Sequence, residues 1–153
     1  MPEMMFKPLC QNEEPSLSLI EYLATEFRTS LQATALRYVG FSRHKVAIIV
    51  SRQDRIDWYK ASSDFGFCLE RGKKLSYESF ASDFFSGGCL HDGMQRVPTD
   101  AWIDCRNPSR IHLLEQSKGF KNYGFVLSLL WLDDIPEDQI DEDEDEDYRD
   151  NWS

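Results

Sequence analysis

Histidine is scarce in this chain, with three among 153 residues, and none stands in a motif that typically holds a catalytic metal. An H-E-x-x-H motif would place two imidazoles one helical turn apart on a zinc ion, with the glutamate activating water. The histidines instead begin H-K-V-A-I at His44, H-D-G-M-Q at His91 and H-L-L-E-Q at His112. The last sequence is one residue short of the inverted H-x-x-E-H motif. The sequence therefore predicts no metal ligand and no catalytic residue.

Paired cysteines and long apolar runs are missing as well. The four cysteines are widely spaced and form no C-x-x-C pair: Cys10, Cys68, Cys89 and Cys105. Because the N-terminus shows no secretion signal, we expect free thiols in a cytoplasmic protein and no cofactor in this chain. Redox sensing by Cys68 or Cys89 is an alternative, but inert thiols are the expectation. The longest apolar run, residues 123–132, is too short for a membrane span, so we expect no membrane association.

Acidic residues outnumber basic ones, but the excess lies at one end of the chain. The formal net charge is −10, and residues 133–150 carry twelve acids and one arginine. The rest of the chain holds 15 acidic and 16 basic residues. We therefore expect a nearly neutral folded part followed by a disordered acidic tail over residues 133–153. Such a tail disfavours binding to nucleic-acid phosphates through repulsion.

Apolar spacing predicts two helices near the N-terminus. Residues 1–15 contain prolines and polar residues, and we expect them to form an entry arm. A Ser-x-x-Glu capping box at Ser18 is expected to begin the first helix. Ser30 is a credible N-cap for the second helix, which Gly40 is expected to end. Residues 16–41 are therefore predicted to form a helix-turn-helix-like pair.

Residues 42–132 show the shorter period of β-strands, with one helix among them. The expected strands are Lys45–Arg52, Arg55–Ser62, 96–104, Ile111–Gln116 and Tyr123–Leu132. The first two should form a hairpin, and Tyr123–Leu132 is the most apolar and should lie centrally. A short amphipathic helix is expected at Tyr77–Phe85. The predicted fold class is α+β, with an N-terminal helical pair, a mostly antiparallel sheet with a flanking helix, and the acidic tail.

Four segments, Tyr22–Val39, Val46–Ser62, Val97–Trp102 and Tyr123–Trp131, together resemble the ImmA/IrrE family of bacterial metallopeptidases. The resemblance implies that the chain corresponds to the helix-turn-helix-like and GAF-like parts that follow the zinc-peptidase domain in this family. Some family members cleave a transcriptional repressor and so switch on stress-response or mobile-element genes. By this resemblance we expect the chain to lack the catalytic domain, and zinc would belong only to that domain. No catalytic residue is therefore carried over, and we expect the chain alone to be inactive as a peptidase.

Aromatic side chains are candidates for a ligand pocket on the sheet. GAF-like folds often hold small molecules among such side chains, with polar groups fixing the orientation. The candidate ligand-binding residues are Trp58, Phe80, Phe84, Trp102 and Tyr123. The alternative is an ordinary hydrophobic core, because aromatic residues supply much of the buried area in a domain of this size.

The second helix of the predicted pair is a candidate for contact with DNA or a partner protein. In a helix-turn-helix reader, exposed residues of this helix enter the major groove. The candidate contact residues are Gln32, Thr34, Arg37 and Tyr38. Only one of them is an arginine, so a helical corner that packs two domains together is the favoured alternative.

The sequence favours a non-catalytic regulatory or interaction domain. By the resemblance, it would sense a ligand or hold a repressor substrate for a metallopeptidase in bacterial stress or mobile-element regulation. A protein partner is expected, either the repressor or a separate peptidase domain, and a small-molecule ligand is a further candidate. Two alternatives stay open: a truncated, non-functional metallopeptidase remnant, and a DNA-binding regulator that uses residues 18–40.

Overall fold

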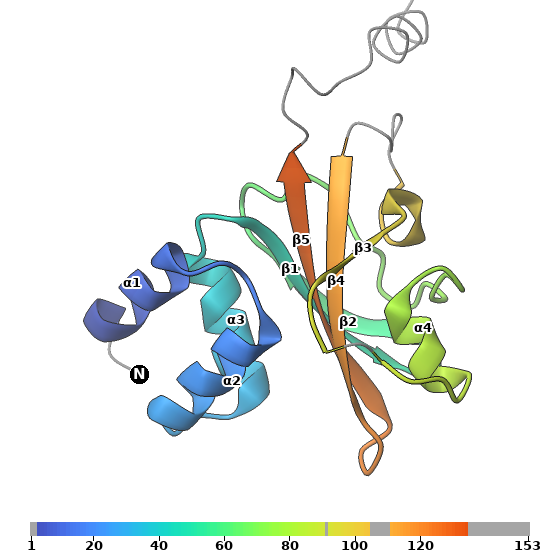
Figure 1. Cartoon of the computed structure of the whole chain (residues 1–153), viewed down its shortest axis with the longest axis horizontal. Helices are drawn as coiled ribbons and strands as arrows, with labels where there is room; N and C mark the ends of the chain where they lie inside the picture. The colour runs from blue at the N-terminus through green and yellow to red at the C-terminus, as the bar shows by residue number, and fades with distance from the viewer. Residues whose placement is uncertain (1–2, 91, 105–110, 135–153) are drawn as a thin grey trace, which may run out of the picture.

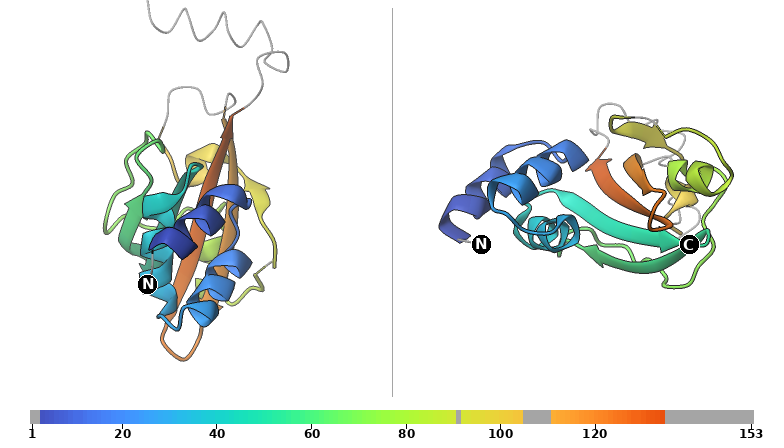
Figure 2. Two further views of the ribbon diagram at one scale, coloured as in Figure 1. Left: turned by 90° about the vertical axis from the view of Figure 1, so that its left-hand side faces the viewer. Right: turned by 90° about the horizontal axis from the view of Figure 1, so that it is seen from below.

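A five-stranded antiparallel sheet forms the centre of the molecule, with helices on both faces (Figures 1 and 2). The computed structural model describes residues 3–90, 92–104 and 111–134. The strands are β1 (Lys45–Arg52), β2 (Arg55–Ala61), β3 (Gln95–Val97), β4 (Ile111–Phe120) and β5 (Phe125–Asp134), in the order β2-β1-β5-β4-β3. The helices are α1 (Glu3–Asn12), α2 (Leu17–Glu26), α3 (Leu31–Phe41) and α4 (Phe80–Phe85), with a 3-10 turn, η1 (Thr99–Ala101). The predicted α+β class is confirmed. No helix in the described part of the chain is long and apolar enough to cross a membrane.

Strand β5 lies in the middle of the sheet, as its apolar sequence predicts, and is buried on both faces. Leu127 and Leu129 point towards α1–α3, whereas Val126 and Leu130 point towards α4. This alternation explains why a nearly continuous apolar run is needed here, because a strand covered on both faces has no solvent side. Trp131 is only half-buried and packs edge-on against His44, with ring centroids 5.5 Å apart.

Helix α1 occupies residues that we expected to form only an entry arm. Phe6 and Cys10 are fully buried, and the Phe6 ring meets Phe27 and Phe41 edge-on at centroid distances of 5.7 and 5.9 Å. The helix forms despite Pro8, which lacks an amide donor and is unfavourable inside a helix. Burial of the aromatic side chain explains the difference, since tertiary packing supplies most helix stability in proteins.

Helices α2 and α3 form the predicted pair, with shifted ends. Ser16, not Ser18, is the N-cap of α2, and its hydroxyl accepts a 3.0 Å hydrogen bond from the Leu19 amide. Ser30 caps α3 as predicted. Helix α3 runs past Gly40 to Phe41, so the expected end at Gly40 is wrong. The buried side chains of both helices share one core with β1 and β5, so the pair packs directly on the sheet.

The predicted hairpin of β1 and β2 is confirmed, and it contains a β-bulge. Val50 pairs with Trp58 but Ser51 pairs with Ile56, which leaves Asp57 as the extra residue. A bulge changes the face towards which the following side chains point. Trp58 consequently packs with the α1–α3 side of the sheet, whereas Ile56 packs with the α4 side.

Further expected elements differ from the structure at their ends, and the expected strand 96–104 is a strand only as far as Val97, where β3 ends. Helix α4 begins at Phe80, after the N-cap Ser79, and Tyr77 is 86% exposed outside it. Strand β4 continues four residues beyond the expected Gln116. Strand β5 extends through Asp134, so the first residues assigned to the acidic tail belong to the sheet. The rest of that predicted tail, residues 135–153, lies outside the described residues.

Candidate functional site

The five aromatic residues proposed as a ligand pocket are not brought together. Phe80 and Phe84 on α4 pack with the buried Trp102 on one face of the sheet. The bulge in β2 places Trp58 against the opposite face. Tyr123 lies in the β4–β5 turn and is 72% exposed. The expectation of a single pocket lined by all five side chains is therefore wrong, because the bulge in β2 and the β4–β5 turn separate them.

The four residues proposed to contact DNA or a partner do not form an exposed face. Thr34 and Tyr38 are fully buried. Thr34 is held by hydrogen bonds to the Thr29 hydroxyl at 2.6 Å and to the Ser30 carbonyl at 2.7 Å. Arg37 is exposed and Gln32 half-exposed. The expectation that Thr34 and Tyr38 are exposed for contact with DNA is therefore wrong, because both side chains point into the core.

The most unusual buried group is the Glu115 carboxylate, which lies beneath α4. One carboxylate oxygen accepts hydrogen bonds from the Phe80 amide at 3.0 Å and the Trp102 indole N–H at 2.7 Å. The other accepts from the Ala81 amide at 2.8 Å and the Ser117 hydroxyl at 2.5 Å. Glu115 thus satisfies the first amides of α4, which lack intrahelical partners. The arrangement fastens α4 and Trp102 to the sheet.

Burial raises the pKa of Glu115, and the hydrogen bonds from Ser117, Trp102 and the α4 amides oppose that rise. Both oxygens are occupied by donors from the protein, and the side chain has no exposed surface. A general acid or base must reach the proton that it transfers. Glu115 therefore has a structural role, although a raised pKa is also common among catalytic residues.

In the sequence, Glu115 stands out only as the glutamate of the H-L-L-E-Q segment that begins at His112. Both residues lie in β4, where residues three apart face opposite sides of the strand, so His112 and Glu115 do not act together. The available signal was the alternation of Leu113, Glu115 and Ser117, which places an acid between an apolar and a small polar side chain on one face of the strand. Three of its four donors, Phe80, Ala81 and Trp102, come from other segments of the chain, so they could not be predicted.

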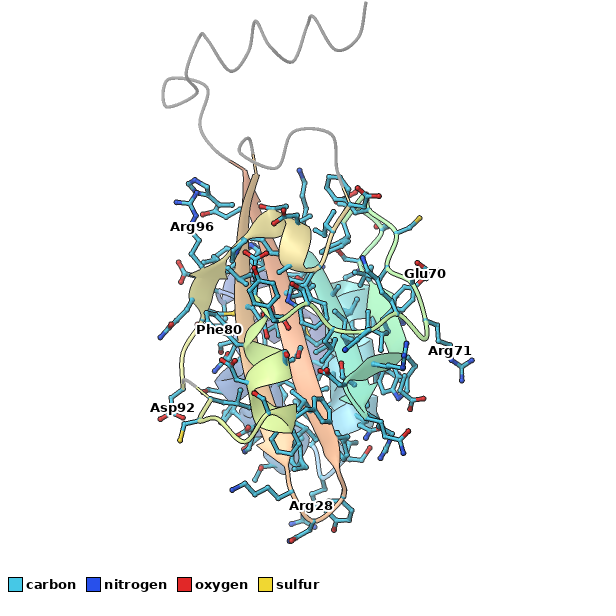
Figure 3. All side chains as sticks on the ribbon, turned by 90° about the vertical axis from the view of Figure 1, so that its right-hand side faces the viewer. Arg28, Glu70, Arg71, Phe80, Asp92 and Arg96 are labelled. Atoms are coloured by element: carbon cyan, nitrogen blue, oxygen red, sulfur yellow. The ribbon has the colours of Figure 1, made fainter. Side chains whose placement is uncertain are left out.

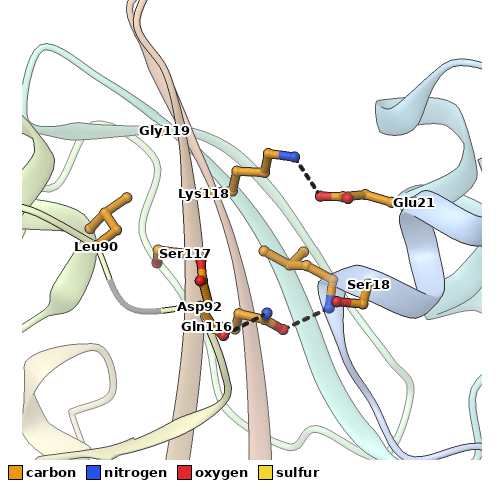
Figure 4. Close-up of a pocket in the computed structure, with 9 residues that line it drawn as sticks. Ser18, Glu21, Leu90, Asp92, Gln116, Ser117, Lys118 and Gly119 are labelled. Atoms are coloured by element: carbon orange, nitrogen blue, oxygen red, sulfur yellow. Dashed lines mark hydrogen bonds and ion pairs between the residues drawn. The ribbon is translucent and has the colours of Figure 1, made fainter.

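A groove of about 450 Å³ lies between α2 and β4 (Figure 4). Helix α2 and the segment before β3 form its two walls, and β4 runs along it. The residues that line it are Leu17, Ser18, Glu21, Leu90, Asp92, Gln116, Ser117, Lys118 and Gly119. Most of these residues are polar or charged, so the groove suits a ligand that forms hydrogen bonds better than an apolar small molecule.

Gln116 joins the two walls of the groove. Its side-chain carbonyl accepts a 2.7 Å hydrogen bond from the Leu17 amide at the start of α2. Its side-chain amide donates to the Asp92 carbonyl at 3.5 Å. Farther along the strand, Lys118 and Glu21 form an exposed ion pair at 2.8 Å. Exposed ion pairs contribute little stability and open easily, so the groove is fixed at Gln116 and adaptable at Lys118.

Strand β4 has an unpaired edge in this groove. Strand β3 pairs only with residues 113–115 of β4, whereas β5 pairs with its whole length. On the side away from β5, residues 116–120 therefore pair with no strand in the described part of the chain. An unpaired edge presents backbone amides and carbonyls that can pair with another chain.

Helix α4, on the face of the sheet opposite to α2, packs against this part of β4. Gly119 lies directly against the Phe84 ring of α4, since a Cβ built on Gly119 would stand 2.3 Å from the ring's Cδ2 atom. Glu115 fixes the start of the same helix. Contacts with α4 therefore support the unpaired edge at residues 116–120.

Metal-binding geometry is not found among the residues that the structure describes, where no three His, Cys, Asp or Glu side chains are grouped around one point. Cys10 is buried, Cys68 and Cys89 are exposed, and all three are free thiols. His91 and Cys105 lie outside the described residues. Comparison with the models of known protein families and with curated proteins gave no match.

Proposed function

We propose that this chain is a non-catalytic interaction domain that holds an extended segment of a partner protein against the edge of β4. The observation that carries the proposal is the unpaired edge at residues 116–120, which lies in the groove between α2 and the segment before β3. An added strand would continue the sheet beyond the end of β3. Its backbone would supply hydrogen bonds, and its alternate side chains would meet the groove walls.

The rigidity of the site supports this mode of binding. Gln116 ties α2 to the Asp92 carbonyl, and Phe84 packs against Gly119 from behind. A peptide that docks on such an edge loses its own freedom but requires little ordering of the domain, which favours affinity. The exposed ion pair of Glu21 and Lys118 leaves room for side chains of different sizes.

The proposed partner follows from the resemblance to ImmA/IrrE proteins. We propose that the bound segment belongs to a repressor or to a separate peptidase domain, with this chain holding the repressor for cleavage elsewhere. The free thiols of Cys10, Cys68 and Cys89 are typical of a reducing compartment, which supports a cytoplasmic location. Ligand sensing by the aromatic set and DNA reading by α3 are less well supported, because those residues are separated or buried.

Selection of a random peptide library on the full chain tests the proposal. Peptides that bind should be extended, and bound peptide should slow amide hydrogen exchange within residues 116–120. The variant Ser18→Trp should weaken binding at least tenfold, because Ser18 is exposed on α2 and lines the groove. Calorimetry would measure the affinity.

Thr25→Trp is the matched control. Thr25 is exposed on the same helix, about two turns farther along, and is not among the groove residues. It should leave peptide affinity unchanged. If both variants bind equally well, or if protection appears elsewhere on the chain, the groove is not the binding site.

A further inference from the structure

A second hollow, of about 390 Å³, lies at the β1–β2 turn, on the strand edge of the sheet opposite to β3. Three arginines line it, and each comes from a different segment: Arg52 ends β1, Arg55 begins β2, and Arg71 lies in the following loop. Figure 3 shows Arg71 on one side of the molecule and Arg96 of β3 on the other. The hollow is therefore separate from the groove beside β4.

Backbone hydrogen bonds fix the loop that carries Arg71 to the start of β2. The Ile56 amide donates to the Lys73 carbonyl at 2.9 Å, and the Gly72 amide donates to the Ile56 carbonyl at 2.7 Å. The Leu75 amide also donates to the Asp54 carbonyl at 2.9 Å. These bonds hold the walls of the hollow at fixed positions.

The guanidinium groups are also oriented by backbone carbonyls. Arg55 donates to the Gly72 carbonyl at 3.1 Å, and Arg71 donates to the Asp57 carbonyl at 2.8 Å. Arg52 donates to the Tyr123 carbonyl at 3.1 Å. A guanidinium carries more N–H donors than such contacts use, so donors remain for a bound oxyanion. Pre-oriented donors lose less freedom on binding.

The local charge has the opposite sign to that of the whole chain. The segments 52–57 and 70–74 carry five cationic residues, Arg52, Arg55, Arg71, Lys73 and Lys74, and three acidic residues, Asp54, Asp57 and Glu70. One of the acids, Asp57, forms a 3.3 Å ion pair with Arg52. The surroundings of the hollow are therefore net positive in a chain with a formal net charge of −10.

We propose that this hollow, the arginine hollow, binds a phosphoryl group. A phosphate monoester carries a charge of about −1.5 to −2 and three acceptor oxygens, which matches the local positive excess better than a single carboxylate does. Arginine forks bind such oxygens in pairs. The source is either free phosphate or a phosphorylated side chain of another protein, and both present the same chemistry.

Titration of the full chain with inorganic phosphate, and separately with a short phosphoserine peptide, tests the proposal. We expect saturable binding of at least one of them in calorimetry, and perturbation of the arginine side-chain NMR signals. The tighter of the two ligands identifies the source. Chloride at the same ionic strength should bind at least tenfold more weakly than this ligand, because it has no oxygens for the arginine forks to bind in pairs.

The double variant Arg55→Gln, Arg71→Gln should weaken the binding at least tenfold. Both residues are exposed, so the fold should persist, and the thermal midpoint checks this. The single variant Arg71→Gln gives a milder test in the same direction. Arg96→Gln is the matched control, since it removes the same charge from an exposed residue at the opposite edge of the sheet. An equal loss in the control, equal binding of chloride, or no saturable binding would overturn the proposal.

Discussion

The indole N–H of Trp102 donates a 2.7 Å hydrogen bond to the buried carboxylate of Glu115. This bond joins the segment after η1 to β4, and the same carboxylate receives the first two amides of α4. Two elements that cover one face of the sheet, α4 and the segment after η1, are thus fastened to one residue of β4. Because α4 supports Gly119 from behind, the stability of this contact also determines how firmly the proposed peptide-binding edge is held.

Replacing Glu115 by glutamine should change how stability depends on pH. Burial raises the pKa of Glu115 above its ordinary value of 4.5, so the folded state retains the proton longer than the unfolded state. The stabilisation from this group is then complete below pH 4.5 and is lost as pH rises through the folded-state pKa. The loss amounts to about 1.4 kcal/mol for each unit of the rise.

Chemical denaturation of both proteins from acidic to neutral pH would measure this effect. The difference in unfolding free energy between wild type and Glu115→Gln cancels the titration of the other carboxyl groups. We expect the advantage of the wild type to shrink as pH rises above 4.5. A difference that stays constant over the whole range would contradict the raised pKa.

Adding a methyl group at Gly119 should destabilise the fold. The new Cβ would lie 2.3 Å from Cδ2 and 2.4 Å from Cε2 of Phe84, closer than van der Waals contact allows. The ring must move, and α4 with it, which should cost about 1–3 kcal/mol. The Gly119→Ala substitution repeated in a Phe84→Ala background should be nearly neutral, because the obstacle is gone.

A double-mutant cycle of these two substitutions, followed by denaturant unfolding, gives the coupling energy directly. Residues in contact typically couple by about 0.5–3 kcal/mol. Additive effects would mean that Phe84 does not pack on Gly119, and the support behind the β4 edge would then need another explanation.

The sheet could be predicted from sequence because its signals are local. The run Tyr123–Leu132 has few polar residues, and it indicated a strand in the centre of the sheet, which β5 confirms. The hairpin was also predicted, although Gln53 and Asp54 are not favoured turn residues. Helix α1 was missed because the prolines in residues 1–15 outweighed Phe6 and Cys10 in the local pattern.

The candidate sites could not be predicted, because they depend on positions that only the folded chain defines. A one-residue bulge at Asp57 reversed the face of Trp58 and divided the expected aromatic pocket. The unpaired edge in the groove exists because β3 stops pairing at Glu115 while β4 continues to Phe120. Both features come from strand register, which residue periodicity does not specify at the level of single residues.

The β1–β2 turn should be stabilised by Asp54→Gly. Gln53 and Asp54 both have positive φ angles, 53° and 62°, which cost an L-residue about 1–2 kcal/mol. The buried Oδ1 atom of Asp54 also has no hydrogen-bond partner within the described part of the chain. Glycine removes both penalties but adds freedom to the unfolded state, so we expect a net gain of about 0.5–1 kcal/mol.

Asp54→Ala separates the two contributions, because it removes the buried oxygen but keeps a side chain at positive φ. Thermal unfolding of the three proteins should rank glycine as most stable. An alanine variant as stable as the glycine variant would show that the buried oxygen, not the backbone conformation, is the source of strain.

Alkylation should distinguish the three described cysteines. Burial raises the pKa of Cys10 to about 12, and the charge of Arg37 opposes this rise only in part. A thiol must lose its proton to react, so Cys10 should resist iodoacetamide at mildly alkaline pH, whereas the exposed Cys68 and Cys89 should be labelled readily. Mass spectrometry of digested samples would measure each rate, and denaturant should bring Cys10 up to the others. Rapid labelling of Cys10 in the native protein would mean that α1 detaches from the core frequently, since its packing is what buries this thiol.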